Sequence, residues 1–140
     1  KTAKTSLEIS CYRRMRGGQL ISKSRYLGAQ MLAYLEDDLW LDNARKANQL
    51  AKRLAEGLRT SNRIRLPLPC EASEVFAVMP RALNDKLHAQ GAHYFDWMPD
   101  TLGPGGVAED EIFVRFVLSY ATPPADVERF IGLVKALSLS

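Results

Sequence analysis

The stretch from residue 39 to residue 59 constrains the fold most strongly, because its apolar residues recur at alternating steps of four and three. This spacing aligns them along one face of an α-helix. The residues of this apolar stripe are Trp40, Ala44, Ala47, Ala51, Leu54 and Leu58. The stripe predicts a helix over residues 39–59, N-capped by Asp37-Asp38 and packed with that face against another layer.

Shorter elements follow this helix. Apolar runs of strand length occupy residues 64–68, 74–79, 92–97 and 111–118, the first of them bounded by prolines and therefore an edge strand. Pro80 suits a first helical turn and Gly91 a helix end, so we predict a helix over residues 80–90. Residues 99–110, rich in Gly and Pro, are predicted to form a flexible loop, and Thr122 to N-cap a terminal helix.

Strands that follow one another or flank a single helix predict an α+β fold, with helices on one face of a small, mostly antiparallel sheet. At 140 residues, of which 46% are apolar, the chain suits one domain. Helical patterning begins near Leu7, is interrupted at Gly17-Gly18 and resumes over residues 20–35. We assign residues 1–11 to a poorly defined N-terminal segment and residues 12–140 to one small domain.

Membrane spans and export signals are not indicated by this sequence. No apolar run approaches the ~18–20 residues that a span requires, and the first residues lack the pattern of a signal peptide. Cys11 and Cys70 stand apart, without a C-x-x-C motif. This usage favours reduced thiols and a cytoplasmic protein, with a single disulfide between them as the alternative.

Arg115 is the most informative single residue, because all its near neighbours in residues 112–118 are apolar. Strand alternation places it on the same face as Phe113 and Val117. A guanidinium there needs a partner, since an unpaired buried charge is costly. One reading is an internal ion pair or a strand end that reaches water. The other is that the guanidinium binds the carboxylate of a ligand through two parallel hydrogen bonds.

Residues 9–35 contain basic but no acidic side chains. The basic residues are Arg13, Arg14, Arg16, Lys23 and Arg25. Near a Gly-Gly break and a helix start, such residues favour binding of a phosphate. Residues i and i+2 of an α-helix point in directions about 200° apart. Lys23 and Arg25 can therefore bind the same phosphate only if they lie in a turn before the helix. The alternatives are a solvated basic face or a nucleic-acid patch, and few interleaved aromatics argue against the latter.

His88 and His93 are the only histidines, and without nearby cysteines they predict structural roles rather than a metal site. Motifs for phosphate loops, serine nucleophiles and dinucleotides are also missing. The acidic run Glu109-Asp110-Glu111 falls in the predicted loop and is expected to be solvated. We therefore expect no metal ligand and no nucleic-acid partner.

Three ordered blocks resemble the C-terminal part of low-specificity L-threonine aldolases, which use pyridoxal 5'-phosphate (PLP). Residues 12–27 contain Tyr-Arg-Arg, Arg-Gly-Gly-Gln-Leu and Ser-Lys-Ser-Arg-Tyr-Leu. Residues 40–58 run from Trp-Leu-Asp-Asn-Ala-Arg-Lys-Ala-Asn to Arg-Leu-Ala-Glu-Gly-Leu. Residues 114–122 read Val-Arg-Phe-Val-Leu-Ser-Tyr-Ala-Thr. Together with the helix that follows, the resemblance covers residues 12–135.

The resemblance implies the small C-terminal domain of a fold-type-I PLP enzyme. The implied reaction is cleavage of a threonine-like β-hydroxy-α-amino acid into glycine and an aldehyde. By position, Arg115 would bind the substrate carboxylate. Arg25 and Lys23 would lie near a PLP phosphate of the neighbouring subunit, in a homodimer or homotetramer.

The departures from the family limit what this chain can do. Neither Lys1 nor Lys4 lies in the turn that carries the family's cofactor-binding lysine, so we expect no catalytic residue here and no activity from this chain alone. Ser24 replaces a methionine, Tyr120 replaces a tryptophan, and residues 98–111 form a longer loop that reshapes substrate access. The alternatives are another fold-type-I PLP lyase, such as a β-eliminating one, or a non-catalytic dimerisation or interaction domain.

Overall fold

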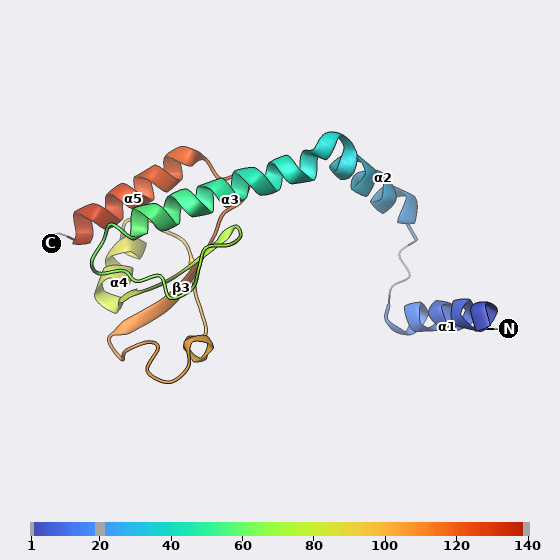
Figure 1. The fold of residues 1–140 in the computed structure, drawn as a ribbon, viewed down its shortest axis with the longest axis horizontal. Coiled ribbons are helices and arrows are strands. Elements are labelled where there is room, and N and C mark those ends of the chain that lie inside the picture. The colour runs from blue at the N-terminus through green and yellow to red at the C-terminus, as the bar shows by residue number, and fades with distance from the viewer. Residues whose placement is uncertain (1, 19–21, 139–140) are drawn as a thin grey trace. The chain divides into compact units, whose positions relative to one another are not determined.

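The computed structural model describes residues 2–18 and 22–138 (Figure 1). The chain forms two compact units, Lys1–Leu39 and Trp40–Ser140. The expected limit between residues 11 and 12 falls inside helix α1 (Thr2–Arg16). This helix begins before the apolar pattern does, because residues 2–16 contain no glycine or proline to stop it. The assignment of residues 12–140 to the small domain stays a prediction.

Helix α1 ends at Gly17-Gly18, as predicted. The Gly17 N–H donates to the carbonyl of Arg13 at 2.9 Å, and Gly18 has a φ of 66°, a left-handed conformation typical of helix C-caps. The next helix, α2, spans Ser24–Leu35. The predicted resumption of helix at Leu20, and with it residues 19–21, lies outside the described residues.

Asp37 and Asp38 do not have the backbone of an N-cap. They lie in the short 3-10 helix η1 (Glu36–Asp38) with φ values of 52° and 57°. An N-cap residue has an extended backbone, whereas aspartate is one of the few residue types that tolerate the left-handed region. The predicted capping by this pair is wrong, and helix α3 (Leu39–Leu58) follows directly.

Helix α3 confirms the predicted helix and buries the later part of its apolar stripe. Ala47, Ala51, Leu54 and Leu58 are buried. Trp40 and Ala44 are exposed, in contrast to the prediction. Figure 1 gives the reason, since the first turns of α3 extend beyond the sheet that the later turns cover.

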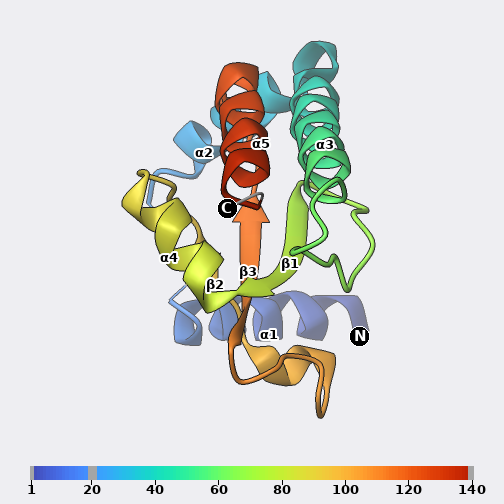
Figure 2. The same ribbon diagram turned by 90° about the vertical axis from the view of Figure 1, so that its left-hand side faces the viewer.

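Within the described residues, the sheet has three antiparallel strands in the order β1-β3-β2. They are β1 (Glu74–Pro80), β2 (Phe95–Asp96) and β3 (Glu111–Val117). Helices α3, α4 (Arg81–Ala89) and α5 (Pro124–Ser138) lie on one face of it (Figure 2). The predicted α+β fold, a small antiparallel sheet covered by helices, is confirmed. None of the described helices is both long and apolar enough for a membrane span.

Two of the predicted strands are shorter than expected. In residues 64–68, pairing is limited to an isolated bridge between Arg65 and Val78, because the flanking prolines have no N–H to donate. Of the strand predicted over residues 92–97, only the two residues of β2 form a strand. The Ala92 N–H donates to a carbonyl at the end of α4, at 3.1 Å, which holds the beginning of this segment away from β3.

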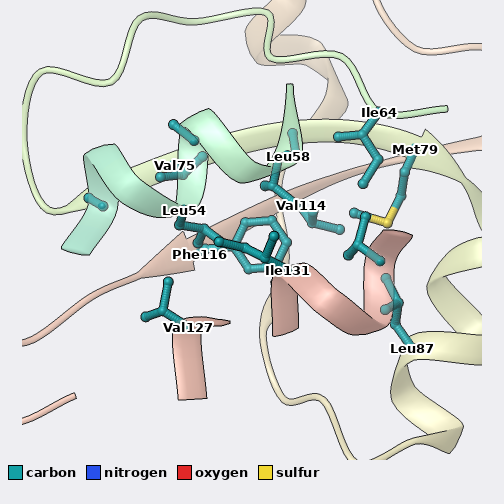
Figure 3. Close-up of a cluster of buried hydrophobic side chains, with 14 of the residues drawn as sticks. Leu54, Leu58, Ile64, Val75, Met79, Leu87, Val114, Phe116, Val127 and Ile131 are labelled. Carbon is teal, nitrogen blue, oxygen red and sulfur yellow. The ribbon is translucent and has the colours of Figure 1, made fainter. Parts of the chain in front are cut away.

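The core lies between the helices and one face of the sheet (Figure 3). It includes Leu54 and Leu58 of α3, Val75 and Met79 of β1, Leu87 of α4, Val114 and Phe116 of β3, and Val127 and Ile131 of α5. Burial of these apolar side chains supplies the main favourable free energy of folding.

Helices α3 and α5 lie close together at Gly57. A Cβ atom there would overlap the side chain of Ile131. We expect Gly57→Ala to lower the free energy of unfolding by about 1–3 kcal/mol, because overpacking forces side chains or backbone to shift. Urea unfolding would measure this, with Gly132→Ala as the control, since a Cβ at Gly132 meets no atom within 4 Å. Equal stabilities of the two variants would contradict the prediction.

The loop before β3 is fastened to the rest of the domain, although its composition predicted flexibility. Its first part forms a 3-10 helix, η2 (Pro99–Leu102). Arg65 Nη2 donates to the carbonyl of Gly106 at 2.6 Å and to Glu111 Oε2 at 2.7 Å. The Ala108 N–H donates to the same carboxylate at 3.0 Å. Arg65 and Glu111 therefore fasten the later part of the loop, at Gly106 and Ala108.

The hydrogen bonds between Arg65, Ala108 and Glu111 make the stability of the fold depend on pH. The hydrogen bond from Arg65, followed by that from Ala108, holds the pKa of Glu111 below its ordinary value. A carboxyl with a lowered folded-state pKa stabilises the fold above its unfolded pKa, and this contribution is lost as the pH falls through the folded one. The Tm deficit of Glu111→Gln at neutral pH should therefore shrink below about pH 4. Thermal unfolding across this range tests it, and a constant deficit would refute it.

Candidate functional site

Arg115 lies on the sheet face opposite to the helices. Val114 and Phe116 on either side of it belong to the core, so alternation along β3 turns Arg115 to the other face. There it pairs in register with Phe76 of β1 and Phe95 of β2. The structure thus places Arg115 in the middle of an aromatic row that crosses the sheet.

The guanidinium of Arg115 is held by two different contacts. Nη1 donates to Glu74 Oε1 at 3.3 Å, a single and long ion pair. The guanidinium carbon also lies 4.1 Å from the ring centroid of Trp97, which is the geometry of a cation–π contact. Nε is buried and has no partner, and Nη2 makes no hydrogen bond within the described residues.

These contacts leave the guanidinium only partly satisfied. An arginine in a structural ion pair commonly forms two parallel hydrogen bonds to one carboxylate. Arg53 does so with Glu128, at 2.6 and 2.7 Å. Arg115 has one weak bond to Glu74 and retains 28% of its side-chain accessibility. Arg115 therefore forms an internal ion pair, as the first interpretation predicts, but its guanidinium still has N–H donors available for an anion.

An open cavity of about 540 Å³ adjoins this arginine, where β2 leaves the edge of β3. Its lining includes Arg115, but also Phe116 on the core face of β3 and Val127, Phe130 and Leu133 of α5. Its volume is in the range of small-ligand sites. The cavity therefore reaches Arg115 but lies mainly on the helix side of the sheet, whereas the guanidinium lies on the other side, at Glu74 and Trp97.

Lys23 and Arg25 are at the beginning of α2, in the first unit. Lys23 is the residue before the helix, with φ −107° and ψ 42°, and Arg25 belongs to the first turn. Both side chains are exposed. No side chain caps the helix, so backbone N–H groups of its first turn also point outward. Only Lys23 therefore precedes the helix, whereas Arg25 lies within it, and the shared binding of one phosphate stays a prediction.

Histidine and cysteine residues do not form a reactive site in the described part of the chain. His88 Nδ1 bonds the carbonyl of Ala92 at 2.9 Å, and its ring stacks on Tyr94 at 4.5 Å, which confirms a structural role. His93 is exposed at the cavity. Cys11 and Cys70 are free thiols. Among the described residues, no group of three or more His, Cys, Asp or Glu side chains is placed to hold a metal.

Glu74 and Trp97 contact Arg115, and the sequence analysis missed both. A signal for Glu74 was present, because it is the charged first residue of an otherwise apolar predicted strand. Trp97 had no such signal, since its position over Arg115 depends on how β2 pairs with β3. The pairing continues one residue beyond β2, where the Trp97 N–H donates to the Phe113 carbonyl at 2.8 Å.

Sequence comparison with characterised proteins identifies relatives over most of the chain. A low-specificity L-threonine aldolase from Pseudomonas aeruginosa is 34% identical over 128 residues, which are 91% of this chain and 33% of that relative. This chain is similar in sequence to low-specificity L-threonine aldolases. A second such aldolase, from a Pseudomonas species, is 31% identical over 126 residues, 90% of this chain and 33% of its own length. No family model matches the chain.

The chain thus spans one third of the length of these aldolases, and the predicted resemblance is confirmed. Solved structures share its fold. A threonine aldolase from Leishmania major superposes with a TM-score of 0.70 at 22% identity, covering 80% of this chain and 30% of that one. A glycine decarboxylase P-protein gives 0.60 at 21% identity, covering 79% and 24%. The fold is that of the small domain of fold-type-I PLP enzymes, as predicted.

Proposed function

We propose that this chain is the C-terminal part of a PLP-dependent carbon–carbon lyase that cleaves a threonine-like β-hydroxy-α-amino acid into glycine and an aldehyde. Similarity to two low-specificity L-threonine aldolases over nine-tenths of the chain carries this proposal. The partly satisfied guanidinium of Arg115 supports it from the chemistry of the site.

In this proposal, Arg115 binds the carboxylate of the amino-acid substrate. The planar fork offers Nη1 and Nη2 to the two carboxylate oxygens, and charge-assisted bonds of this kind are shorter and stronger than a 3.3 Å contact. The substrate would therefore replace or share the Glu74 contact. A carboxylate fixed in this way sets the orientation of the bonds at the α-carbon.

Lys23 and Arg25 are proposed to hold the phosphate of PLP, in the neighbouring subunit of a homodimer or homotetramer. Two cations and the uncapped first turn of α2 fit a phosphate group, which carries negative charge and accepts hydrogen bonds. PLP supplies the electron withdrawal on which the reaction depends. This chain contributes binding and orientation, with no residue in a catalytic role, and we expect it to be inactive alone. The two free thiols support a cytoplasmic location.

Another fold-type-I PLP lyase is the second candidate, because decarboxylases share this fold. A tryptophan decarboxylase from Catharanthus roseus gives a TM-score of 0.54 at 19% identity over 68% of this chain and 21% of its own length. The similarity to threonine aldolases is higher in sequence and in structure. A non-catalytic dimerisation or interaction domain is the remaining alternative.

The decisive experiment is an assay of the full-length protein loaded with PLP. We expect L-threonine to yield glycine and acetaldehyde in equal amounts. Release of carbon dioxide, or of pyruvate from L-serine without aldehyde, would instead favour another PLP enzyme. The absence of all these products, together with no binding of PLP, would favour the non-catalytic alternative.

A further inference from the structure

Trp97 is fixed in place more firmly than the arginine that it covers. Its backbone N–H donates to the Phe113 carbonyl at 2.8 Å. Its ring meets the Phe76 ring edge-on, with centroids 5.7 Å apart and an interplanar angle of 64°. Phe76 in turn lies 5.9 Å from the ring of Phe113, which is fully buried. The indole is therefore a rigid platform on the open face of the sheet.

We propose that Trp97 is a positioning residue for Arg115. Its ring holds the guanidinium plane in the one orientation that presents the fork to the substrate carboxylate. This inference rests on the proposed role of Arg115 and assigns the residue that makes this role effective.

Stacking is well suited to this task because it uses the face of the guanidinium and not its edge. All five N–H donors of arginine lie in the guanidinium plane, so a ring above that plane leaves them available. An acidic partner would instead consume the donors that a substrate needs. The guanidinium carbon lies over the Trp97 ring, 4.1 Å from its centroid, a separation that suits such stacking.

Hydrogen bonds do not fix the orientation of Arg115 in the described structure. Nε has no partner, and the one bond from Nη1 to Glu74 is 3.3 Å long. A single bond of this length leaves rotation about the side chain's terminal torsions. The contact with the indole ring supplies a further restraint. Without it, the long side chain would have to lose its rotamer freedom when substrate binds, which weakens binding.

The test compares Trp97→Leu and Trp97→Phe in the full-length, PLP-loaded protein. Trp97→Leu removes the ring, and we expect KM for L-threonine to rise about three- to tenfold, as the loss of one partly buried cation–π contact predicts. Trp97→Phe keeps a smaller ring and should restore part of the affinity. The effect should fall on KM more than on kcat, because orientation of the carboxylate acts in the bound and transition states alike. Calorimetric titration with glycine gives a second readout that does not depend on turnover.

A double-mutant cycle with Arg115→Gln separates positioning from structural support. If Trp97 acts through Arg115, Trp97→Leu should leave KM and glycine affinity unchanged in the Arg115→Gln background. The inference would be overturned if Trp97→Leu weakened glycine binding equally in the wild-type and Arg115→Gln backgrounds. It would also be overturned if both Trp97 variants kept the wild-type KM while Arg115→Gln raised it. An unchanged KM of Arg115→Gln itself would remove the proposed carboxylate-binding role of Arg115 as well, whereas the product assay tests the proposed reaction separately. Trp97→Phe keeps the test decisive should the leucine variant not fold.

Discussion

Arg115→Gln in the full-length, PLP-loaded protein is expected to lower kcat/KM for L-threonine about hundredfold, which is roughly 3 kcal/mol. Glutamine is shorter than arginine and lacks the charge and the planar guanidinium, so it cannot form two charge-assisted bonds to a carboxylate. The glutamine amide can still accept or donate one hydrogen bond. The loss should therefore appear mainly as weaker substrate binding.

Arg115→Lys refines this expectation. Lysine keeps the positive charge but presents a point charge that cannot bind a carboxylate through two parallel bonds. We expect an affinity between those of the wild type and the glutamine variant. Steady-state kinetics, together with the absorbance spectrum of the bound cofactor, would separate loss of substrate binding from loss of PLP.

Arg53→Gln is the matched control for the arginine substitutions. Arg53 also pairs with a glutamate, Glu128, but this pair joins α3 and α5 on the exposed surface. The pair raises the pKa of Arg53 and lowers that of Glu128, as expected for a mutual ion pair. Its loss should leave KM unchanged. If Arg115→Gln had the wild-type KM, the proposed binding of the substrate carboxylate by Arg115 would be refuted, whatever the control shows.

The second large effect is expected from Phe116→Ala, which should lower the free energy of unfolding by about 3–5 kcal/mol. Phe116 is 6% exposed. Its ring contacts those of Tyr94 and Phe130, with centroids 4.7 and 5.3 Å apart. Removing it leaves a cavity where β3, α5 and the segment before β2 meet.

Val117→Ala is the control for this core substitution, because the next residue on β3 faces the opposite side and is 53% exposed. Its cost should be well under 1 kcal/mol, as for most exposed positions. Chemical denaturation of both variants measures the difference. Similar costs at both positions would mean that Phe116 is no more important to the packing than the exposed Val117, contrary to the structure.

Tyr94 shows how the same packing determines a side chain's chemistry. Burial, followed by repulsion from Asp96 and Asp85, raises the pKa of Tyr94 well above its ordinary value. Its hydroxyl donates to Asn84 Oδ1 at 2.9 Å. Tyr94 therefore remains neutral and supports the aromatic cluster around Phe116.

The sequence by itself determined the regular elements and the fold class. The stripe of α3 and the apolar runs of β1 and β3 are periodic over enough residues to identify their type. The blocks around Arg115 and the Gly-Gly break carried the resemblance to threonine aldolases, which comparison confirmed. Periodicity and short motifs are local properties, so they can be read along the chain.

Only the tertiary structure decided the environment of Arg115 and the extent of the weaker strands. Trp97 reaches the guanidinium because β2 pairs with β3, and Glu74 reaches it because β1 pairs on the other side. The segment before β2 leaves the sheet because Ala92 bonds to the end of α4. These outcomes depend on contacts between residues far apart in sequence, whose free energies are set by register and packing and not by any local pattern.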